Sequence, residues 1–270
     1  MGASYFNQLN IPIGLVLLFL MGIGPLLSWN YTSQSVLLNR FKLPLSISFL
    51  SGIGYMIFSS SFQIYVFVAI MGVSFTLSSI LGEFYKSYKK QKKASNFLHS
   101  IAKMFLSNRH KNGGYIVHIG IVLLFIGFIG RAFEVEKEFS LSPGEQIYFS
   151  NYVFKLNSIK SEARDNHYAF LSEIDVVDSS TNQLLTNLKP EKRIYFYWNS
   201  DPEKRQPHSE LDIYSTIQKD IYSIFSGYDA QKNIGYFKIM INPLVNWVWI
   251  GGVLMVIGSL FAFWPSRRNS

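Results

Sequence analysis

Five apolar runs divide this chain, and each approaches the length needed to cross a bilayer. They cover residues 11–29, 43–59, 62–82, 113–131 and 243–264. A membrane-spanning helix needs about 20 predominantly apolar residues, so each run predicts one such helix. Three serines at 59–61 separate the second run from the third, which predicts a tight helical hairpin. Pro25 and Pro44 lie near the ends of their runs, where proline disturbs a helix least.

A different pattern fills residues 132–242, between the fourth and fifth runs. Short segments rich in aromatic and β-branched residues alternate there with turn-forming residues such as Pro143-Gly144, which predicts strands. The expected strands cover 146–156, 169–177, 193–198, 211–217 and 236–241. The predicted fold class is an α-helical polytopic membrane protein with about five transmembrane helices. Its β-rich extracytoplasmic domain, a small antiparallel sheet or barrel, lies between helices 4 and 5.

Charge separates the same two parts of the chain and predicts their orientation. The net charge is +8, but residues 132–241 hold 12 basic and 16 acidic residues. The remaining 13 basic residues lie beside the apolar runs, together with one acid, Glu83. Loop 30–42, loop 83–112 and the tail at Arg267-Arg268 are basic, so all three are predicted to be cytoplasmic. This distribution does not favour nucleic-acid binding, which needs a basic soluble surface.

The predicted organisation therefore has five parts. Residues 1–82 form the first three transmembrane helices, and 83–112 form a basic cytoplasmic loop with an interfacial amphipathic helix around Phe97–Phe105. Residues 113–131 form a histidine-bearing transmembrane helix. Residues 132–242 form the extracytoplasmic domain, and 243–270 form the last helix and a basic tail. The first run lacks a basic segment before it and a small-residue cleavage site after it, so we expect a retained helix.

His118 is the candidate functional residue, because it is the only histidine within an apolar run. A polar ring in hydrocarbon is costly and usually has a partner. Helical geometry places Gly114, Val122 and Phe125 on the side of His118, and Gly120 on the opposite side with Gly127. Three roles stay open for His118 on the residues alone: a hydrogen bond to another helix, which is the ordinary role of such a residue, an axial ligand to haem iron, for which imidazole is common, and a proton relay.

The other candidate residues carry weaker signals. His99 and His110 fall in the basic loop, and His167 and His208 fall in the outer domain, where we expect turn residues. A membrane haem with two histidine ligands would therefore need its second ligand from another subunit. Arg131 is expected to be an interfacial arginine, with a haem propionate or an outer acid as the alternative partner.

Some classes of chemistry are not supported by the sequence. It contains no cysteine, so disulfides, zinc–thiolate sites and iron–sulfur sites are excluded within this chain. It also lacks a nucleophile elbow, a Walker loop, an HExxH motif and a dinucleotide fingerprint. No catalytic residue is therefore predicted.

Four stretches in the same order resemble the C-terminal part of the CcmF family, the haem-lyase subunits of the cytochrome c maturation system. The stretches span nearly the whole chain: Tyr5–Asn7 with Met21–Trp29; Gly113–Gly120 continuing to Gly127 and Phe133; Glu136–Glu138 with Pro143–Glu145, Glu191–Arg193 and Asp220–Tyr222; and Asn242–Gly252. Each stretch alone is a weak signal, whereas the ordered set is specific.

This resemblance implies a function in cytochrome c biogenesis. CcmF-type proteins take haem from the chaperone CcmE and help attach it to apocytochrome c. They also carry a transmembrane haem b, held by two histidines, that is thought to keep substrate haem reduced. His118 matches the second of those histidines, and no other family ligand can be carried over.

The family's haem-presenting region and first transmembrane histidine would precede the part present here. We therefore expect the C-terminal product of a split CcmF, or an excised piece of one, that shares its haem with an N-terminal partner subunit and has no ligation activity alone. The expected partners also include the apocytochrome-presenting subunits CcmH and CcmI, holo-CcmE, apocytochrome c and membrane lipid.

Two other functions stay open on the sequence. One is a structural assembly subunit without haem, and the other is a b-haem quinol-oxidising subunit of another complex. The expected location is the bacterial inner membrane, with the large domain in the periplasm; the mitochondrial inner membrane is the alternative.

Overall fold

The chain forms two compact units in the computed structural model. One comprises residues 1–132 and 247–270 and is helical, and the other comprises 133–246 and is built of strands. The structure describes all residues except 1–2, 28–32, 92–103, 107, 197–206 and 265–270. Within the described residues, five helices are long and apolar enough to cross a membrane. The chain is thus a multi-pass membrane protein with a β-structured unit, and the predicted fold class is confirmed.

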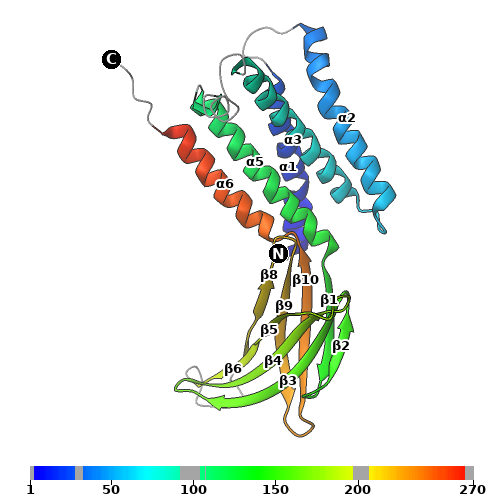
Figure 1. Cartoon of the computed structure of the whole chain (residues 1–270), viewed down its shortest axis with the longest axis vertical. Coiled ribbons are helices and arrows are strands. Elements are labelled where there is room, and N and C mark those ends of the chain that lie inside the picture. The colour runs from blue at the N-terminus through cyan, green and yellow to red at the C-terminus, as the bar shows by residue number, and fades with distance from the viewer. Residues whose placement is uncertain (1–2, 28–32, 92–103, 107, 197–206, 265–270) are drawn as a thin grey trace. The chain divides into compact units, whose positions relative to one another are not determined.

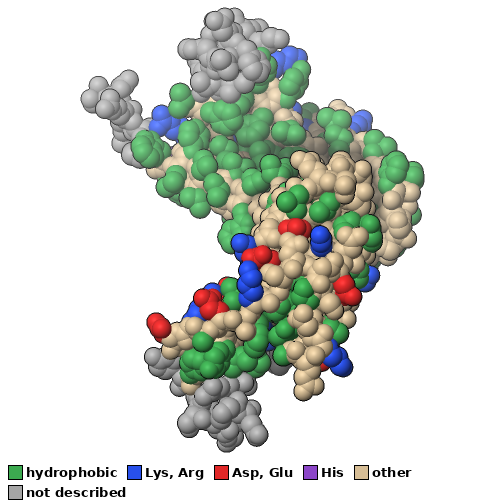
Figure 2. All heavy atoms as spheres, turned by 60° about the horizontal axis from the view of Figure 1, so that its bottom comes forward, with side chains coloured by type: hydrophobic (Ala, Val, Ile, Leu, Met, Phe, Trp, Pro, Cys, Tyr) green, Lys and Arg blue, Asp and Glu red, His purple; other side chains and the backbone are tan. Residues whose placement is uncertain are grey.

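The helical unit is organised around one central helix. Its helices are α1 (Ala3–Ile23), η1 (Gly24–Leu26), α2 (Gln34–Phe58), α3 (Ile64–Gln91), α5 (Arg109–Gly130), η3 (Arg131–Phe133) and α6 (Asn246–Phe263). Helix α3 packs against α1, α2 and α5, as Figure 1 shows. Apolar side chains cover much of the visible surface of this unit in Figure 2, whereas charged side chains gather on the strand-built unit. That distribution suits contact with lipid or with other membrane helices.

The helical hairpin expected at the three serines is present between α2 and α3. Tyr55 closes it, because its hydroxyl donates to the Ser61 carbonyl at 3.1 Å and accepts from the Gln63 amide at 3.1 Å. Near the middle of the pair, the Ser48 hydroxyl donates to the Met71 carbonyl at 2.9 Å. Through these bonds, polar side chains of the serine-rich hairpin find hydrogen-bond partners within the helix pair.

The predicted extents of several helices were too short. Helix α2 begins at Gln34, so Arg40 and Lys42 are helical rather than in a loop, and Pro44 lies well inside the helix. Helix α3 likewise continues to Gln91, through the first residues of the expected basic loop. Apolarity marks only the hydrocarbon part of a helix, whereas the hydrogen-bonded backbone continues into the polar region. Of the expected interfacial helix, residues 104–106 are helical and 97–103 lie outside the described residues.

Glycines bring α5 and α6 into close contact. A Cβ added at Gly120 would lie 2.6 Å from the Cγ of Met255 and 2.7 Å from the carbonyl oxygen of Gly251. A Cβ at Gly258 would lie 2.8 Å from the amide nitrogen of Val117. Small residues let helix backbones approach in this way, and dispersion contacts then hold helices together in lipid. The expectation that Gly120 lies on a packing face is therefore confirmed.

The second unit is a β-sandwich. One sheet has four strands in the order β1-β10-β9-β8, and the other has the order β2-β3-β4-β6-β7, with β5 paired to β4. The strands are β1 (Val135–Leu141), β2 (Gln146–Phe149), β3 (Tyr152–Ala163), β4 (His167–Asp178), β5 (Leu184–Leu188), β6 (Glu191–Tyr195), β7 (Pro207–Glu210), β8 (Asp212–Ser215), β9 (Lys219–Asp229) and β10 (Ile234–Pro243). All the described pairings are antiparallel.

Side chains from both sheets form the core of the sandwich. Phe237, Ile239 and Ile241 are buried on alternate positions of β10, as the period of a strand requires. The rings of Phe237 and Phe225 are stacked with centroids 4.8 Å apart. Phe154 and Ile174 contribute from the opposite sheet, and both are fully buried. The closed apolar interior explains why the unit needs no disulfide.

Two strand predictions need correction. The single strand expected at 146–156 is a hairpin, because Ser150 adopts a positive φ of 55° and the chain reverses between β2 and β3. Apolar residues lie on both sides of the turn, so the sequence pattern predicted one continuous strand. Strands β1, β5, β7 and β9 were not predicted. Glu136, Lys137 and Glu138 give β1 a polar composition that hides it. The result is two packed sheets rather than one small sheet or barrel.

The glycine contact between α5 and α6 predicts a difference between two alanine substitutions in one helix. We expect Gly120→Ala to destabilise the chain by about 1–3 kcal/mol, because the methyl group forces the backbones apart. A Cβ at Gly114 would meet no atom within 4 Å. We therefore expect Gly114→Ala to be neutral or to stabilise the helix by up to about 1 kcal/mol. Thermal unfolding in detergent, followed by circular dichroism, measures both. Equal effects of the two substitutions would contradict the packing.

Candidate functional site

Helix α5 carries the candidate residue, and its start is fixed locally. The side-chain oxygen of Asn108 accepts a hydrogen bond from the Lys111 amide at 3.1 Å, which caps the helix. The Asn112 side chain donates to the Met104 carbonyl at 2.7 Å and ties the preceding segment to the helix. From there the helix runs without a break to Gly130, and His118 lies near its middle.

His118 has a nitrogen without a partner. Its ring is half-buried, and its Nδ1 atom is buried with no hydrogen-bond partner in the described part of the chain. A buried polar atom without a partner costs about 1–3 kcal/mol, and a ligand, a water or a neighbouring chain can supply the partner. The interhelical hydrogen bond that the sequence left as an alternative is not formed among these residues.

The neighbours of His118 on the helix show which way it faces. Val122, one turn further, is fully buried in a cluster with Leu18 of α1 and Val73 of α3. Tyr115, almost one turn earlier, packs edge-on against Phe84 of α3 with ring centroids 5.5 Å apart. Because residues three and four apart share a helix face, His118 lies on the face turned toward α1 and α3. The glycine contact with α6 occupies the other side.

The surroundings of His118 fit a haem ligand chemically. A Cβ at Gly114 would meet no atom within 4 Å, so the clearance expected one turn away is present. The adjoining face is apolar, and the imidazole has a buried nitrogen that lacks a partner. These features match the needs of a porphyrin with an axial histidine. His118 therefore has the donor chemistry of a haem ligand and is the residue that would hold such a group.

A charged cluster closes the basic end of the same face. Glu83 of α3 accepts from Lys86 at 2.9 Å and from Lys111 of α5 at 3.2 Å. The Lys111 ammonium also lies 5.4 Å from the centre of the Tyr115 ring. The sequence showed Glu83 as the single acid of the helical part but did not indicate its partners, because α3 and α5 are separated by the basic loop.

The outer histidines are not turn residues, contrary to the prediction. His167 begins β4 and is buried, its Nδ1 lies 2.6 Å from the Asn166 side-chain oxygen, and its ring packs on Tyr195 at 4.9 Å. His208 lies exposed in the edge strand β7, with its ring 5.7 Å from that of Tyr195. Strands β4 and β7 both pair with β6, and this pairing places the two histidines in strands. Local turn signals in the sequence do not report such pairing.

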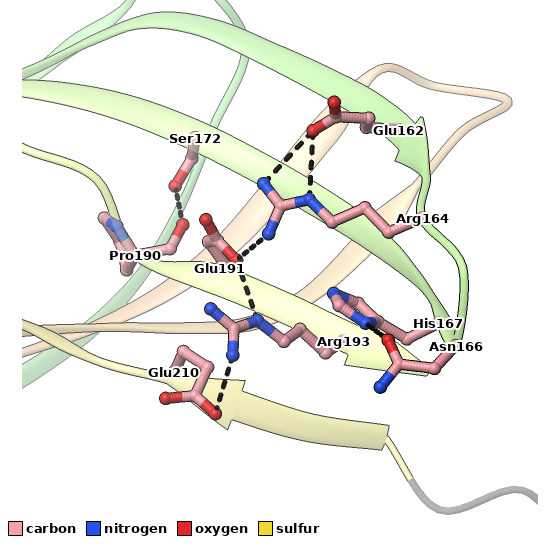
Figure 3. A network of polar contacts seen from close by, with 9 residues as sticks. All are labelled: Glu162, Arg164, Asn166, His167, Ser172, Pro190, Glu191, Arg193 and Glu210. Carbon is pink, nitrogen blue, oxygen red and sulfur yellow. Dashed lines mark hydrogen bonds and ion pairs between the residues drawn. The ribbon is translucent and has the colours of Figure 1, made fainter. Parts of the chain in front are cut away.

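The charged residues beside His167 form a ladder of alternating sign, drawn in Figure 3. Arg164 pairs with Glu162 and Glu191, and Arg193 pairs with Glu191 and Glu210. Hydrogen bonds to Tyr195 and Glu191 raise the pKa of Arg193 above its ordinary value. Every charge of the ladder has a partner, so it stabilises the strand edge. No group of three potential metal ligands occurs among the residues that the structure describes.

The remaining predicted residues lie apart from His118. Arg131 is exposed at the end of α5, in η3, as expected of an interfacial arginine. His110 is exposed in the first turn of α5 rather than in a loop. His99 lies outside the described residues. Among the described residues, the candidate spans contain two histidines, His110 and His118, and both lie on α5.

Comparison with known proteins agrees with this architecture. Residues 132–243 match the family described as the CcmF C-terminal beta-sandwich. CcmF of Haemophilus influenzae is 24% identical over 267 residues, which cover 98% of this chain and 39% of that protein. CcmF of Pseudomonas aeruginosa is 24% identical over 263 residues, covering 97% and 37%. A solved structure of the cytochrome c haem lyase CcmF aligns with a TM-score of 0.74 at 20% identity, over 98% of this chain and 41% of that one.

These findings place the chain among polytopic membrane proteins that carry a β-sandwich between their last two helices. Within that class it corresponds to the C-terminal part of CcmF, and its sandwich belongs to the CcmF C-terminal beta-sandwich family. The chain spans less than two-fifths of the length of these two CcmF relatives. The resemblance inferred from the four sequence stretches is confirmed.

The charged cluster yields a stability prediction. Glu83→Gln leaves Lys86 and Lys111 without an acidic partner, so we expect the free energy of unfolding to fall by about 1–2 kcal/mol, near the contribution of a hydrogen bond to a charged group. Glu138→Gln is the control, since Glu138 is 79% exposed and lies 4.0 Å from Lys238. Exposed pairs contribute little. Thermal unfolding in detergent compares the two, and an equal shift would contradict the linking role of Glu83.

Proposed function

We propose that this chain acts in cytochrome c biogenesis as a subunit of a membrane haem lyase. The relatives that it resembles over nearly its whole length are named for cytochrome c-type biogenesis. Because the chain spans less than two-fifths of those proteins, its own share of the activity is the C-terminal membrane part and the sandwich.

His118 is the residue that carries this proposal. Its imidazole would hold a transmembrane haem b as one of two ligands, and this would give a partner to a ring that has a buried nitrogen without one. When bound, haem b supplies one-electron transfer, which can keep substrate haem reduced. Val122 and its cluster with Leu18 and Val73 exclude water on one side of the imidazole. The rigid contact of α5 with α6 holds the ligand in place.

The second ligand would come from a partner subunit. His110 stands on the same helix as His118, and helices α1, α2, α3 and α6 contain no histidine. Two residues of one straight helix cannot bind opposite faces of a porphyrin. The haem is therefore shared with the N-terminal CcmF half, which also supplies the haem-presenting region.

The orientation and other partners follow from the same assignment. The basic loop and tail face the cytoplasm, and the sandwich faces the periplasm of a bacterial inner membrane. There the sandwich contacts the N-terminal half or the apocytochrome-presenting subunits CcmH and CcmI. Holo-CcmE delivers haem, and apocytochrome c receives it.

The haem content of the complex tests the proposal. We expect the chain co-purified with its N-terminal partner to contain a b-type haem, and His118→Ala to remove at least nine-tenths of it at matched protein. The loss follows because the iron loses one of two ligands. The reduced-minus-oxidised optical spectrum and the pyridine haemochrome measure the content.

The matched control is His110→Ala, which removes an exposed imidazole from the same helix. It should leave the spectrum unchanged. If the complex assembles but contains no haem in the wild type, or if His118→Ala retains it, then the chain is a structural assembly subunit and the haem assignment is wrong.

A further inference from the structure

A large cavity lies at the basic end of the helical unit. Its volume is about 1250 Å³, above the roughly 300–1,000 Å³ of pockets for drug-sized ligands. It is bounded by η1, the start of α2, the end of α3 and the start of α5. All four boundaries belong to one compact unit.

The charges of this cavity are unbalanced. Arg40, Lys86, Lys89 and Lys111 line it, against the single carboxylate of Glu83. Lys86 and Lys111 share that carboxylate, yet their side chains remain 52% and 44% exposed. Arg40 donates to the Leu26 carbonyl at 3.1 Å, which holds its guanidinium at the cavity wall. The cavity therefore favours an anion.

The other wall of the cavity is apolar. Its lining includes Leu26 of η1, the adjoining Leu27, and Val36 and Leu43 of α2. Gly82 leaves open space on α3, because a Cβ there would meet no atom within 4 Å. An apolar wall beside a group of cations, at the level where the membrane helices end, matches an amphiphile with an anionic head group. Basic pockets between transmembrane helices bind anionic lipid head groups in this way.

We infer that this cavity is a binding site for an anionic phospholipid. The head-group phosphate lies among Arg40, Lys86, Lys89 and Lys111, and an acyl chain follows the apolar wall toward Leu43. A bound lipid would fill the space between α2 and α3 at the end opposite their hairpin. This site is separate from the haem proposal, since it requires neither His118 nor a partner subunit.

Native mass spectrometry of the 270-residue chain in nonionic detergent tests the inference. The probes are phosphatidylglycerol and phosphatidylcholine with identical acyl chains. We expect one tightly retained phosphatidylglycerol per chain, bound about tenfold more strongly than phosphatidylcholine. Lys86→Gln with Lys89→Gln should weaken phosphatidylglycerol binding about tenfold, because two cations near a lipid surface together contribute attraction of at least this order. Phosphatidylcholine binding should not change.

Two controls separate a built site from general surface charge. Lys42→Gln with Arg109→Gln removes the same charge from residues that do not line the cavity, and it should leave binding unchanged. Gly82→Phe fills the cavity without changing charge and should abolish selective retention. Gly54→Phe, also placed where a Cβ meets no atom within 4 Å, should have no effect.

Three results would overturn the inference. The first is equal retention of the two lipids by the wild type. The second is equal weakening by the cavity and control substitutions, which would mean nonspecific attraction. The third is release of the lipid when the N-terminal partner is added, which would show that the cavity is a protein interface.

Discussion

The cost of a polar group in hydrocarbon is the constraint on which the helical unit depends. The chain meets this cost with internal hydrogen bonds at the hairpin and with the Glu83 cluster at the basic end. His118 is different, because its Nδ1 is buried and has no partner among the described residues. The fold satisfies its other central polar groups nearby and leaves this imidazole on an apolar face. That contrast supports a role for His118 that is completed from outside the chain.

Helix packing holds α5, and with it His118, in a fixed position. The glycines of α5 and α6 bring the two backbones into contact, and Val122 locks the opposite face against α1 and α3. A ligand on a helix fixed from both sides keeps its geometry better than one on a loop. The sandwich uses another principle, in which a closed apolar core and a paired charge ladder stabilise an outer unit without cysteines.

The sequence predicted the features that depend on local pattern. Apolar runs located five helices, and helical spacing placed Gly120 opposite His118. The features that the sequence did not predict depend on contacts between residues far apart in the chain or on backbone conformation. The hairpin at Ser150 required a positive φ, the burial of His167 required pairing with β6, and the Glu83–Lys111 link required α3 beside α5. Helix ends were also too short, since hydropathy does not report where hydrogen bonding stops.

The central claim is that His118 is an axial ligand, and a ligand exchange tests it most directly. The measurement is low-temperature electron paramagnetic resonance of the ferric complex with its N-terminal partner, for the wild type and His118→Met. The account predicts a bis-histidine signal in the wild type, converted to a histidine–methionine signal with a raised midpoint potential in the variant. An unchanged bis-histidine signal in the variant would contradict the account, because both ligands would then come from elsewhere.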